Sequence, residues 1–212
     1  FAFCDSDVLF LRPVKNPFVL PDDGSTNAIF MEDRVHSYSL RSWQLAFSPR
    51  VRLPSRVNTG MVCLRKAQYD LDLLDWFVGK RRHAAIPTMV EQTAWALLGQ
   101  RIGCRKFAPE QIRVMRNGES SDELVAGHFT ARTRHLLPHF VERSHDVSVD
   151  DQPVTVGTID PGRCTALDIA VYEGQRIASK LVDRLRWSGR NAGSQGPTSD
   201  KSVAGELRKN RR

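Results

Sequence analysis

Two aspartates, Asp5 and Asp7, flank a single serine inside an otherwise apolar stretch, FAFCDSDVLFLRPV. In an extended backbone, residues i and i+2 point to the same side, so both carboxylates can face one divalent cation. Burying two carboxylates is costly unless a metal ion or a cationic side chain compensates their charge. The pattern predicts a metal site at the end of a strand, and the alternative is a plain loop whose acids face water.

A second polar group interrupts the apolar segment Val57-Asn58-Thr59-Gly60-Met61. Gly60 allows a tight turn or the close approach of a ligand, because it has no Cβ atom. The Asn58 amide can both donate and accept hydrogen bonds. A β-turn uses the same residue types, so this segment alone does not distinguish a binding site from a turn.

Glu91 and Gln92 stand at the start of a predicted helix that begins after Pro87. A carboxylate and an amide at this position can hold sugar hydroxyl groups, and Glu91 can also accept a proton. Equally, Glu91 can complement the positive end of the helix dipole. The sequence leaves both interpretations open.

A histidine between apolar residues, His128, is followed by Arg132 and Arg134. An imidazole can complete the coordination of a cation held by carboxylates, and arginines can pair with phosphate. A single histidine is also a common structural hydrogen-bonding residue. Three further histidines lie nearby, at His135, His139 and His145, so the choice of ligand is open.

Strand and helix patterns alternate around these residues. Short apolar runs predict strands, and apolar residues at a period near 3.6 predict helices. The predicted strands are Phe1–Phe3, which we expect to be buried, Val8–Leu11, Asn27–Met31, Val57–Leu64 and Cys104–Phe107. The predicted helices are Tyr69–Val78, Thr88–Leu98 and Arg163–Trp187. The alternation favours an α/β layered sheet.

The chain divides by composition into three parts. Residues 1–140 carry the motifs above, and residues 141–187 form a C-terminal strand and helix extension. Residues 188–212 are rich in Ser, Gly, Asn, Lys and Arg, and they cannot bury enough apolar surface to order themselves. We therefore expect a disordered basic tail after Trp187. The chain begins with Phe1 inside an apolar run, so we also expect an N-terminal portion, with any targeting segment, to precede it.

The charge and cysteine content exclude several classes of protein. The 212 residues include 31 Lys and Arg against 24 Asp and Glu, a net charge of +7. The excess is scattered or lies in the last residues, without the basic stripe interleaved with aromatics that nucleic-acid binding requires. Cys4, Cys63, Cys104 and Cys164 are far apart, without zinc-finger spacing, so we expect core thiols. No run reaches the roughly 18 apolar residues of a membrane span.

The order of the motifs resembles the GT-A glycosyltransferases, most closely the family-8-like group. The resemblance covers residues 1–140 and implies a partial GT-A mixed sheet flanked by helices. Asp5 and Asp7 would bind the manganese or magnesium ion that carries the diphosphate of a nucleotide sugar, with Ser6 near the ribose. His128 would be the late metal ligand.

The same resemblance implies roles for the remaining polar residues. The segment of Asn58, Thr59 and Gly60 would line the sugar and acceptor side, and Glu91 and Gln92 would be the polar pair near the donor sugar. The implied reaction moves a sugar from a nucleotide-sugar donor to a sugar, lipid or protein acceptor, through an oxocarbenium-like transition state.

The chain departs from the family in two places. The residues after His128 read Phe-Thr-Ala-Arg-Thr-Arg instead of the family's Gly- and Lys-containing motif, so Arg132 or Arg134 would replace the phosphate contact. The strands that hold the nucleotide base in the family would precede Phe1, so the resemblance implies that the chain as given is a fragment that binds a donor poorly.

Two other interpretations fit parts of the pattern. A phosphohydrolase of the haloacid-dehalogenase type also has a D-x-D motif after its first strand, and it would make Asp5 the nucleophile. It requires a late acidic pair, for which the sequence offers Asp150 and Asp151. A non-catalytic remnant that acts as a binding module is the third interpretation.

Overall fold

The computed structural model describes residues 1–48, 50–79, 86–119, 124–144 and 152–192. The chain divides into two compact units, Phe1–Glu173 and Gly174–Arg212. The prediction of a disordered tail at residues 188–212 is wrong for residues 188–192, which belong to the last helix, ending at Ala192. Residues 193–212 and the acidic pair at 150 and 151 lie outside the described residues.

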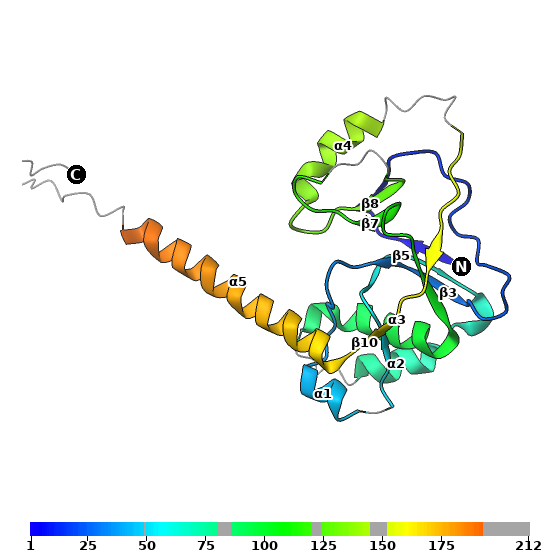
Figure 1. The fold of residues 1–212 in the computed structure, drawn as a ribbon, viewed down its shortest axis with the longest axis horizontal. Helices are drawn as coiled ribbons and strands as arrows, with labels where there is room; N and C mark the ends of the chain where they lie inside the picture. Colours follow the sequence, from blue (N-terminus) through cyan, green and yellow to red (C-terminus); the bar gives the residue numbers. More distant parts are fainter. Residues whose placement is uncertain (49, 80–85, 120–123, 145–151, 193–212) are drawn as a thin grey trace, which may run out of the picture. The chain divides into compact units, whose positions relative to one another are not determined.

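The first unit is built around one mixed sheet (Figure 1). Among the described residues, its eight strands are β1 (Ala2–Cys4), β2 (Val8–Phe10), β3 (Ala28–Glu32), β5 (Val57–Leu64), β6 (Cys104–Phe107), β7 (Ile112–Val114), β8 (Ala126–His128) and β9 (Thr158–Ile159). They follow the order β1-β5-β3-β7-β8-β2, and β6 pairs with β3 and with β9. A small second sheet joins β4 (Leu53–Pro54) to β10 (Arg163–Cys164).

The sheet combines parallel and antiparallel neighbours. β5 runs antiparallel to both β1 and β3, and β2 runs antiparallel to β8. β3 runs parallel to β6 and β7, and β7 runs parallel to β8. Parallel pairs require a crossover, which here includes the helix α3 between β5 and β6. This arrangement confirms the predicted α/β class with helices flanking a sheet.

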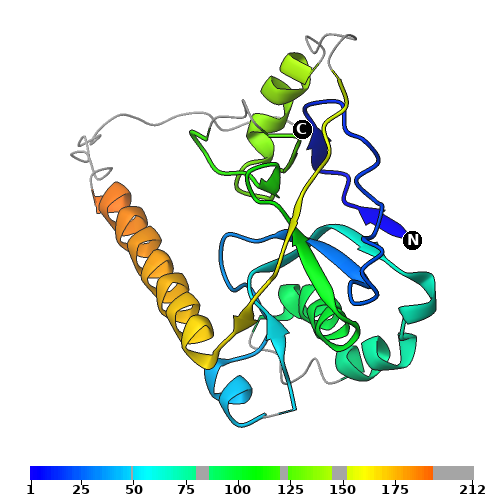
Figure 2. The ribbon, with the colours of Figure 1, turned by 45° about the vertical axis from the view of Figure 1, so that its right-hand side comes forward.

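The helices are α1 (Ser42–Ala46), α2 (Leu71–Gly79), α3 (Val90–Ile102), α4 (Leu137–Ser144) and α5 (Ala166–Ala192), with 3-10 turns at Lys66–Gln68, Pro87–Met89 and Arg134–Leu136. Side chains of α2 and α3 pack with those of β3 and β5 in one apolar cluster, which includes Phe30, Leu64 and Leu98. Figure 2 shows the two helices, in blue-green and green, below the strands of the sheet. A Cβ atom on Gly99 would lie 2.4 Å from the Phe30 ring, so the glycine allows α3 to approach β3 closely.

Several predicted boundaries are confirmed and others shift. The strands predicted at Val57–Leu64 and Cys104–Phe107 coincide with β5 and β6. The helix predicted from Arg163 begins at Ala166, because Arg163 and Cys164 pair with β4. That helix continues without interruption through Gly174 to Ala192. None of the described helices is both long enough and apolar enough to cross a membrane.

The first strand differs from its prediction as a buried strand. All three residues of β1 are exposed, and the Phe1 and Phe3 side chains are 51% and 40% exposed. The reason is its position: within the part of the chain that the structure describes, β1 pairs with β5 alone and stands at the edge of the sheet. An apolar sequence by itself does not distinguish an edge strand from a central one.

Charged side chains pair at the C-terminal end of β3, where Glu32 and Lys106 are buried. The Glu32 carboxylate accepts a hydrogen bond from Lys106 Nζ at 2.8 Å and forms an ion pair with Arg56 at 2.8 Å. Glu32 and Lys106 are both buried, so removal of either partner would leave an uncompensated charge. This pairing holds the point at which the chain leaves β3 toward Asp33.

The four cysteines are free thiols with unequal exposure. Cys63 and Cys164 are buried and Cys104 is half-buried, whereas Cys4 is exposed, contrary to its prediction as a core thiol. Cys4 is exposed because it lies on the edge strand β1. Burial raises the pKa of Cys104 and of Cys164 to about 12.

We predict that iodoacetamide at pH 8, with a chelator present, alkylates Cys4 first and leaves Cys104 and Cys164 unmodified in the folded chain. The thiolate is the reactive form, and at this pH it is a minor species for a thiol with a pKa near 12. Peptide mass spectrometry measures the extent of labelling at each position. Labelling of Cys104 as fast as that of Cys4 would contradict the burial seen here, and denatured protein provides the fully labelled control.

Candidate metal centre

The two aspartates lie where the chain leaves one strand of the sheet and enters another. Before them, β1 pairs with β5, and the Asp5 backbone N–H donates to the Gly60 carbonyl at 2.8 Å. After them, β2 pairs with β8, and the Asp7 carbonyl accepts from the Phe129 backbone N–H at 2.8 Å. The crossing from β1 to β2 therefore places both carboxylates between β5 and β8.

The side chains of Asp5, Asp7 and His128 converge on one point. His128 Nε2 lies 3.0 Å from Asp7 Oδ1 and 3.6 Å from Asp5 Oδ2. One ligand atom from each of the three residues lies within 4.8 Å of the others. The side chains of His128 and Asp7 are 8% and 11% exposed, whereas that of Asp5 is 38% exposed. His128 and Asp7 are thus shielded from solvent, and the group is accessible to solvent at Asp5.

Asn58 determines which nitrogen of His128 carries a proton. Asn58 Oδ1 accepts the Gly60 backbone N–H at 2.8 Å, so this atom is the acceptor end of the amide. The same oxygen lies 2.9 Å from His128 Nδ1, which must therefore donate. In the neutral ring, Nε2 then presents its lone pair toward the two carboxylates. A lone pair and a carboxylate oxygen 3.0 Å apart repel each other unless a cation, either a proton or a metal ion, lies between them.

The orientation of Asn58 is fixed in turn by a buried chain of hydrogen bonds. Gln92 Nε2 donates to the Ser37 carbonyl at 2.9 Å and to Asp33 Oδ2 at 3.2 Å, so Gln92 Oε1 is directed to Asn58 Nδ2 at 3.4 Å. Ser37 Oγ also donates to Asp33. All four of these residues are buried. A satisfied buried network of this kind holds one arrangement of its members.

Gly60 leaves the space that the imidazole occupies. A Cβ atom at this position would lie 2.2 Å from His128 Nδ1 and 2.6 Å from Cε1. Any larger residue on β5 would therefore displace the His128 ring. The requirement for glycine here comes from close approach, since no unusual backbone angle is involved.

Arg134, an exposed residue, fixes the orientation of the Asp7 carboxylate. Its Nε and one terminal nitrogen donate to Asp7 Oδ2 at 2.9 and 2.7 Å, and Asp7 Oδ1 faces His128. Two ligand residues, His128 and Asp7, thus have outer hydrogen-bonding partners in Asn58 and Arg134. Such outer partners are typical of metal ligands, because they fix the orientation and basicity of the coordinating atom.

A bound cation would relieve the unfavourable surroundings of the Asp5 carboxylate. Burial is the main cause that raises the pKa of Asp5 above its usual value. His128 and Arg134 oppose this rise, and the negative charge of Asp7 adds to it. A bound divalent cation would stabilise both carboxylates in their charged forms.

The residues present fit a divalent metal ion. Ligand atoms at about 2.1 Å from an ion and at a right angle lie ~3 Å apart, close to the 3.0 Å between His128 Nε2 and Asp7 Oδ1. Two carboxylates and one imidazole suit manganese or magnesium better than a thiophilic ion, because the donor set is hard. The partial exposure of Asp5 leaves room for further oxygen ligands from a substrate or water.

The other predicted site residues lie around this centre at different depths. Gln92 is buried and contacts Asn58, whereas its neighbour Glu91 is exposed, because successive helix residues point about 100° apart. Ser6 and Arg132 are exposed, and Thr59 is half-buried. His135 and His139 are exposed, and His145 lies outside the described residues.

Sequence reasoning did not identify Asp33 and Ser37 as members of the site. Asp33 follows directly after β3, and the Glu32-Asp33 pair at the end of the apolar run NAIFM was the available signal. Acids at a strand end are common on protein surfaces, so the sequence did not show that Asp33 is buried against Gln92.

We predict that Asn58→Leu lowers the manganese affinity of the chain by roughly 10- to 100-fold, the cost typical of losing an outer partner of a metal ligand. The substitution removes the acceptor that fixes the His128 ring. Isothermal titration calorimetry measures the affinity. Asn27→Leu is the matched control, because this amide donates to the Ile102 carbonyl and is distant in sequence from the site. Equal affinities of the two variants would show that the Asn58 contact does not hold His128 in a ligand orientation.

No protein-family model, curated protein or solved structure matches this chain.

Proposed function

We propose that the chain is a metal-dependent glycosyltransferase of the GT-A type, which moves a sugar from a nucleotide-sugar donor to a sugar, lipid or protein acceptor. The observation that carries the proposal is the convergence of the neighbouring aspartates Asp5 and Asp7 with His128, which is distant from them in sequence, on one partly open point. The motif order that suggested the family in the sequence is consistent with this arrangement.

Asp5, Asp7 and His128 are the residues that would hold manganese or magnesium. A bound ion supplies neutralising charge to the diphosphate, which then leaves as a less basic group. The open side of the centre at Asp5 is where phosphate oxygens would complete the coordination.

Arg134 is the side chain best placed for a second phosphate contact. It is 65% exposed although it donates two hydrogen bonds to Asp7, so part of its guanidinium group remains accessible to a ligand. An arginine presents five N–H donors and can pair with a carboxylate and a phosphate together. Arg132 is exposed nearby in sequence, and we assign the phosphate contact to Arg134 because its position is fixed by Asp7.

The buried amides of Asn58 and Gln92 lie behind the His128 ligand, on the side of the centre away from solvent. Their side chains form hydrogen bonds with His128, Asp33 and Ser37. These bonds fix the arrangement of the centre before a donor binds. Preorganised dipoles of this kind contribute to catalysis because they need not reorient during the reaction. Glu91 is exposed, and we therefore leave the proton acceptor of the reaction unassigned.

The side chains that face the two aspartates also distinguish this proposal from a phosphohydrolase. That reaction would require a second acidic pair near the two aspartates, and among the described residues the groups that pair with them are basic: His128 with both and Arg134 with Asp7. Asp150 and Asp151 lie outside the described residues. The observed neighbours favour an anionic ligand bound with a cation over a covalent aspartyl intermediate.

A panel of nucleotide sugars tests the proposal. We expect at least one diphosphate-linked sugar to bind weakly in the presence of manganese and to lose this binding when EDTA is added. We also expect slow manganese-dependent release of the nucleoside diphosphate, measured by chromatography. Binding that is equally strong in EDTA, or hydrolysis of simple phosphate monoesters in place of nucleotide sugars, would contradict the glycosyltransferase proposal.

A further inference from the structure

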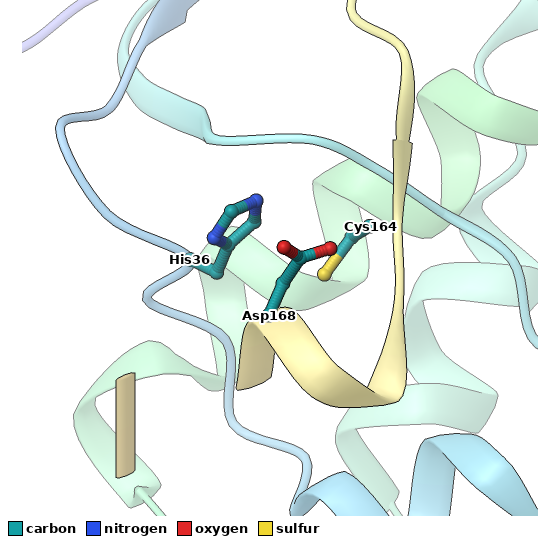
Figure 3. A group of neighbouring side chains, drawn as sticks. All are labelled: His36, Cys164 and Asp168. Carbon is teal, nitrogen blue, oxygen red and sulfur yellow. The ribbon is translucent and has the colours of Figure 1, made fainter. Parts of the chain in front are cut away.

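A second group of ligand-type side chains lies outside the centre described above (Figure 3). It consists of His36, from the loop after β3, Cys164, on β10, and Asp168, in the first turn of α5. One ligand atom from each residue lies within 4.8 Å of the other two. Figure 3 shows the Asp168 carboxylate between the imidazole and the thiol.

We propose that His36, Cys164 and Asp168 bind one zinc-class divalent ion. An imidazole, a thiol and a carboxylate are the three side-chain types that coordinate zinc in proteins. Tetrahedral ligands at zinc lie roughly 3.5 Å apart, so small side-chain rotations would bring these atoms from their present spacing into coordination. The fourth position would be taken by water, because His36 and Asp168 are only partly buried.

The hydrogen bonds of the three residues leave room for coordination. Asp168 accepts from the backbone N–H and the hydroxyl of Thr165, each at 2.7 Å, and both bonds go to Oδ2. Its Oδ1 atom can therefore coordinate an ion while the start of α5 stays capped. His36 Nε2 lies 2.9 Å from Ser55 Oγ, a contact that can fix the tautomer of the ring.

Coordination by Cys164 requires its thiol to lose a proton. Burial, together with the charge of Asp168, raises the pKa of the Cys164 thiol to about 12. Binding of the ion would deprotonate the thiol, forming a metal–sulfur bond and releasing one proton to solvent.

The two groups differ in the ion that they would select. A thiolate ligand favours zinc and related soft or borderline ions, whereas carboxylates and imidazole without sulfur suit manganese and magnesium. The second site would join the loop after β3 to β10 and the start of α5, three segments separated in sequence. A ligand that binds only the folded chain stabilises it, so zinc should raise the melting temperature.

Cobalt(II) titration of the EDTA-treated, desalted chain tests this proposal. Coordination by thiolate gives cobalt an intense near-ultraviolet charge-transfer band, which oxygen and nitrogen ligands do not produce. We expect this band to saturate at one equivalent and to disappear when zinc is added. We expect Cys164→Ser to abolish it and His36→Gln to weaken cobalt binding at least tenfold. His36→Gln keeps the buried thiol, so it remains informative if Cys164→Ser does not fold.

Two control variants separate this site from the candidate centre at Asp7. Cys4→Ser removes the exposed thiol beside Asp5, and Asp7→Asn removes a ligand of the other centre, so both should keep the cobalt–thiolate band. Absence of the band in the unmodified chain, or its loss in Cys4→Ser with retention in Cys164→Ser, would overturn the proposal. Because the two groups share no residue, the test does not depend on the glycosyltransferase proposal.

Discussion

Asp7→Asn is expected to lower the affinity of the chain for manganese by roughly 100-fold or more, at least the cost of losing an outer partner of a metal ligand. Asp7 Oδ1 is the carboxylate oxygen closest to His128 Nε2, at 3.0 Å. An asparagine keeps the shape of the side chain and removes the charge that attracts the ion. Calorimetric titration with manganese, with and without a nucleotide sugar, measures the effect.

The fold should tolerate this substitution. Arg134, which pairs with Asp7, is 65% exposed and can be solvated when its partner is neutral, so we expect a stability loss below about 1 kcal/mol. Asp22→Asn is the matched control, because it removes the same charge at an exposed position. An Asp7→Asn variant that binds manganese as tightly as the Asp22→Asn control would show that Asp7 is not a ligand.

Gly60→Ala is expected to disrupt the same centre without changing any ligand. The added Cβ atom would lie 2.2 Å from His128 Nδ1, so the ring must move away from Asn58 and from the aspartates. Overpacking of this kind costs about 1–3 kcal/mol of stability. We also expect a roughly 10- to 100-fold loss of manganese affinity, similar to the loss of an outer partner.

Gly174→Ala provides the control for Gly60→Ala. Gly174 lies inside α5, and a Cβ atom there would have no neighbour within 4 Å. The same chemical change should therefore stabilise the helix by about 0.5–1 kcal/mol. Thermal denaturation compares the two variants, and manganese titration separates the local effect at His128 from global destabilisation. Wild-type manganese affinity in Gly60→Ala would remove His128 from the ligand set.

The sequence predicted the bounds of two strands correctly, β5 at Val57–Leu64 and β6 at Cys104–Phe107. β5 has apolar residues on both sides of its polar segment, and β6 begins and ends with an apolar residue. The short strands β4, β7, β9 and β10 have only two or three residues, too few for a periodic pattern, and they form because the longer strands offer partners. The exposure of β1 depends on its place at the edge of the sheet, which local sequence does not encode.

The site itself was predicted in part. Spacing alone suggested that Asp5 and Asp7 share one target, and His128 was one of four neighbouring candidates. Only the pairing of β2 with β8, which sets Val8 opposite His128, shows why that histidine faces Asp7. Asp33 and Ser37 belong to the site because Gln92 donates hydrogen bonds to both. These contacts join residues more than fifty positions apart, so local sequence patterns do not predict them.

Anomalous scattering from crystals soaked in manganese chloride locates the ion that Asp5, Asp7 and His128 would bind. We expect a manganese peak bounded by Asp5, Asp7 and His128, and no such peak in the Asp7→Asn variant. A manganese peak elsewhere, including at His36, Cys164 and Asp168, with none beside Asp7, would contradict this expectation.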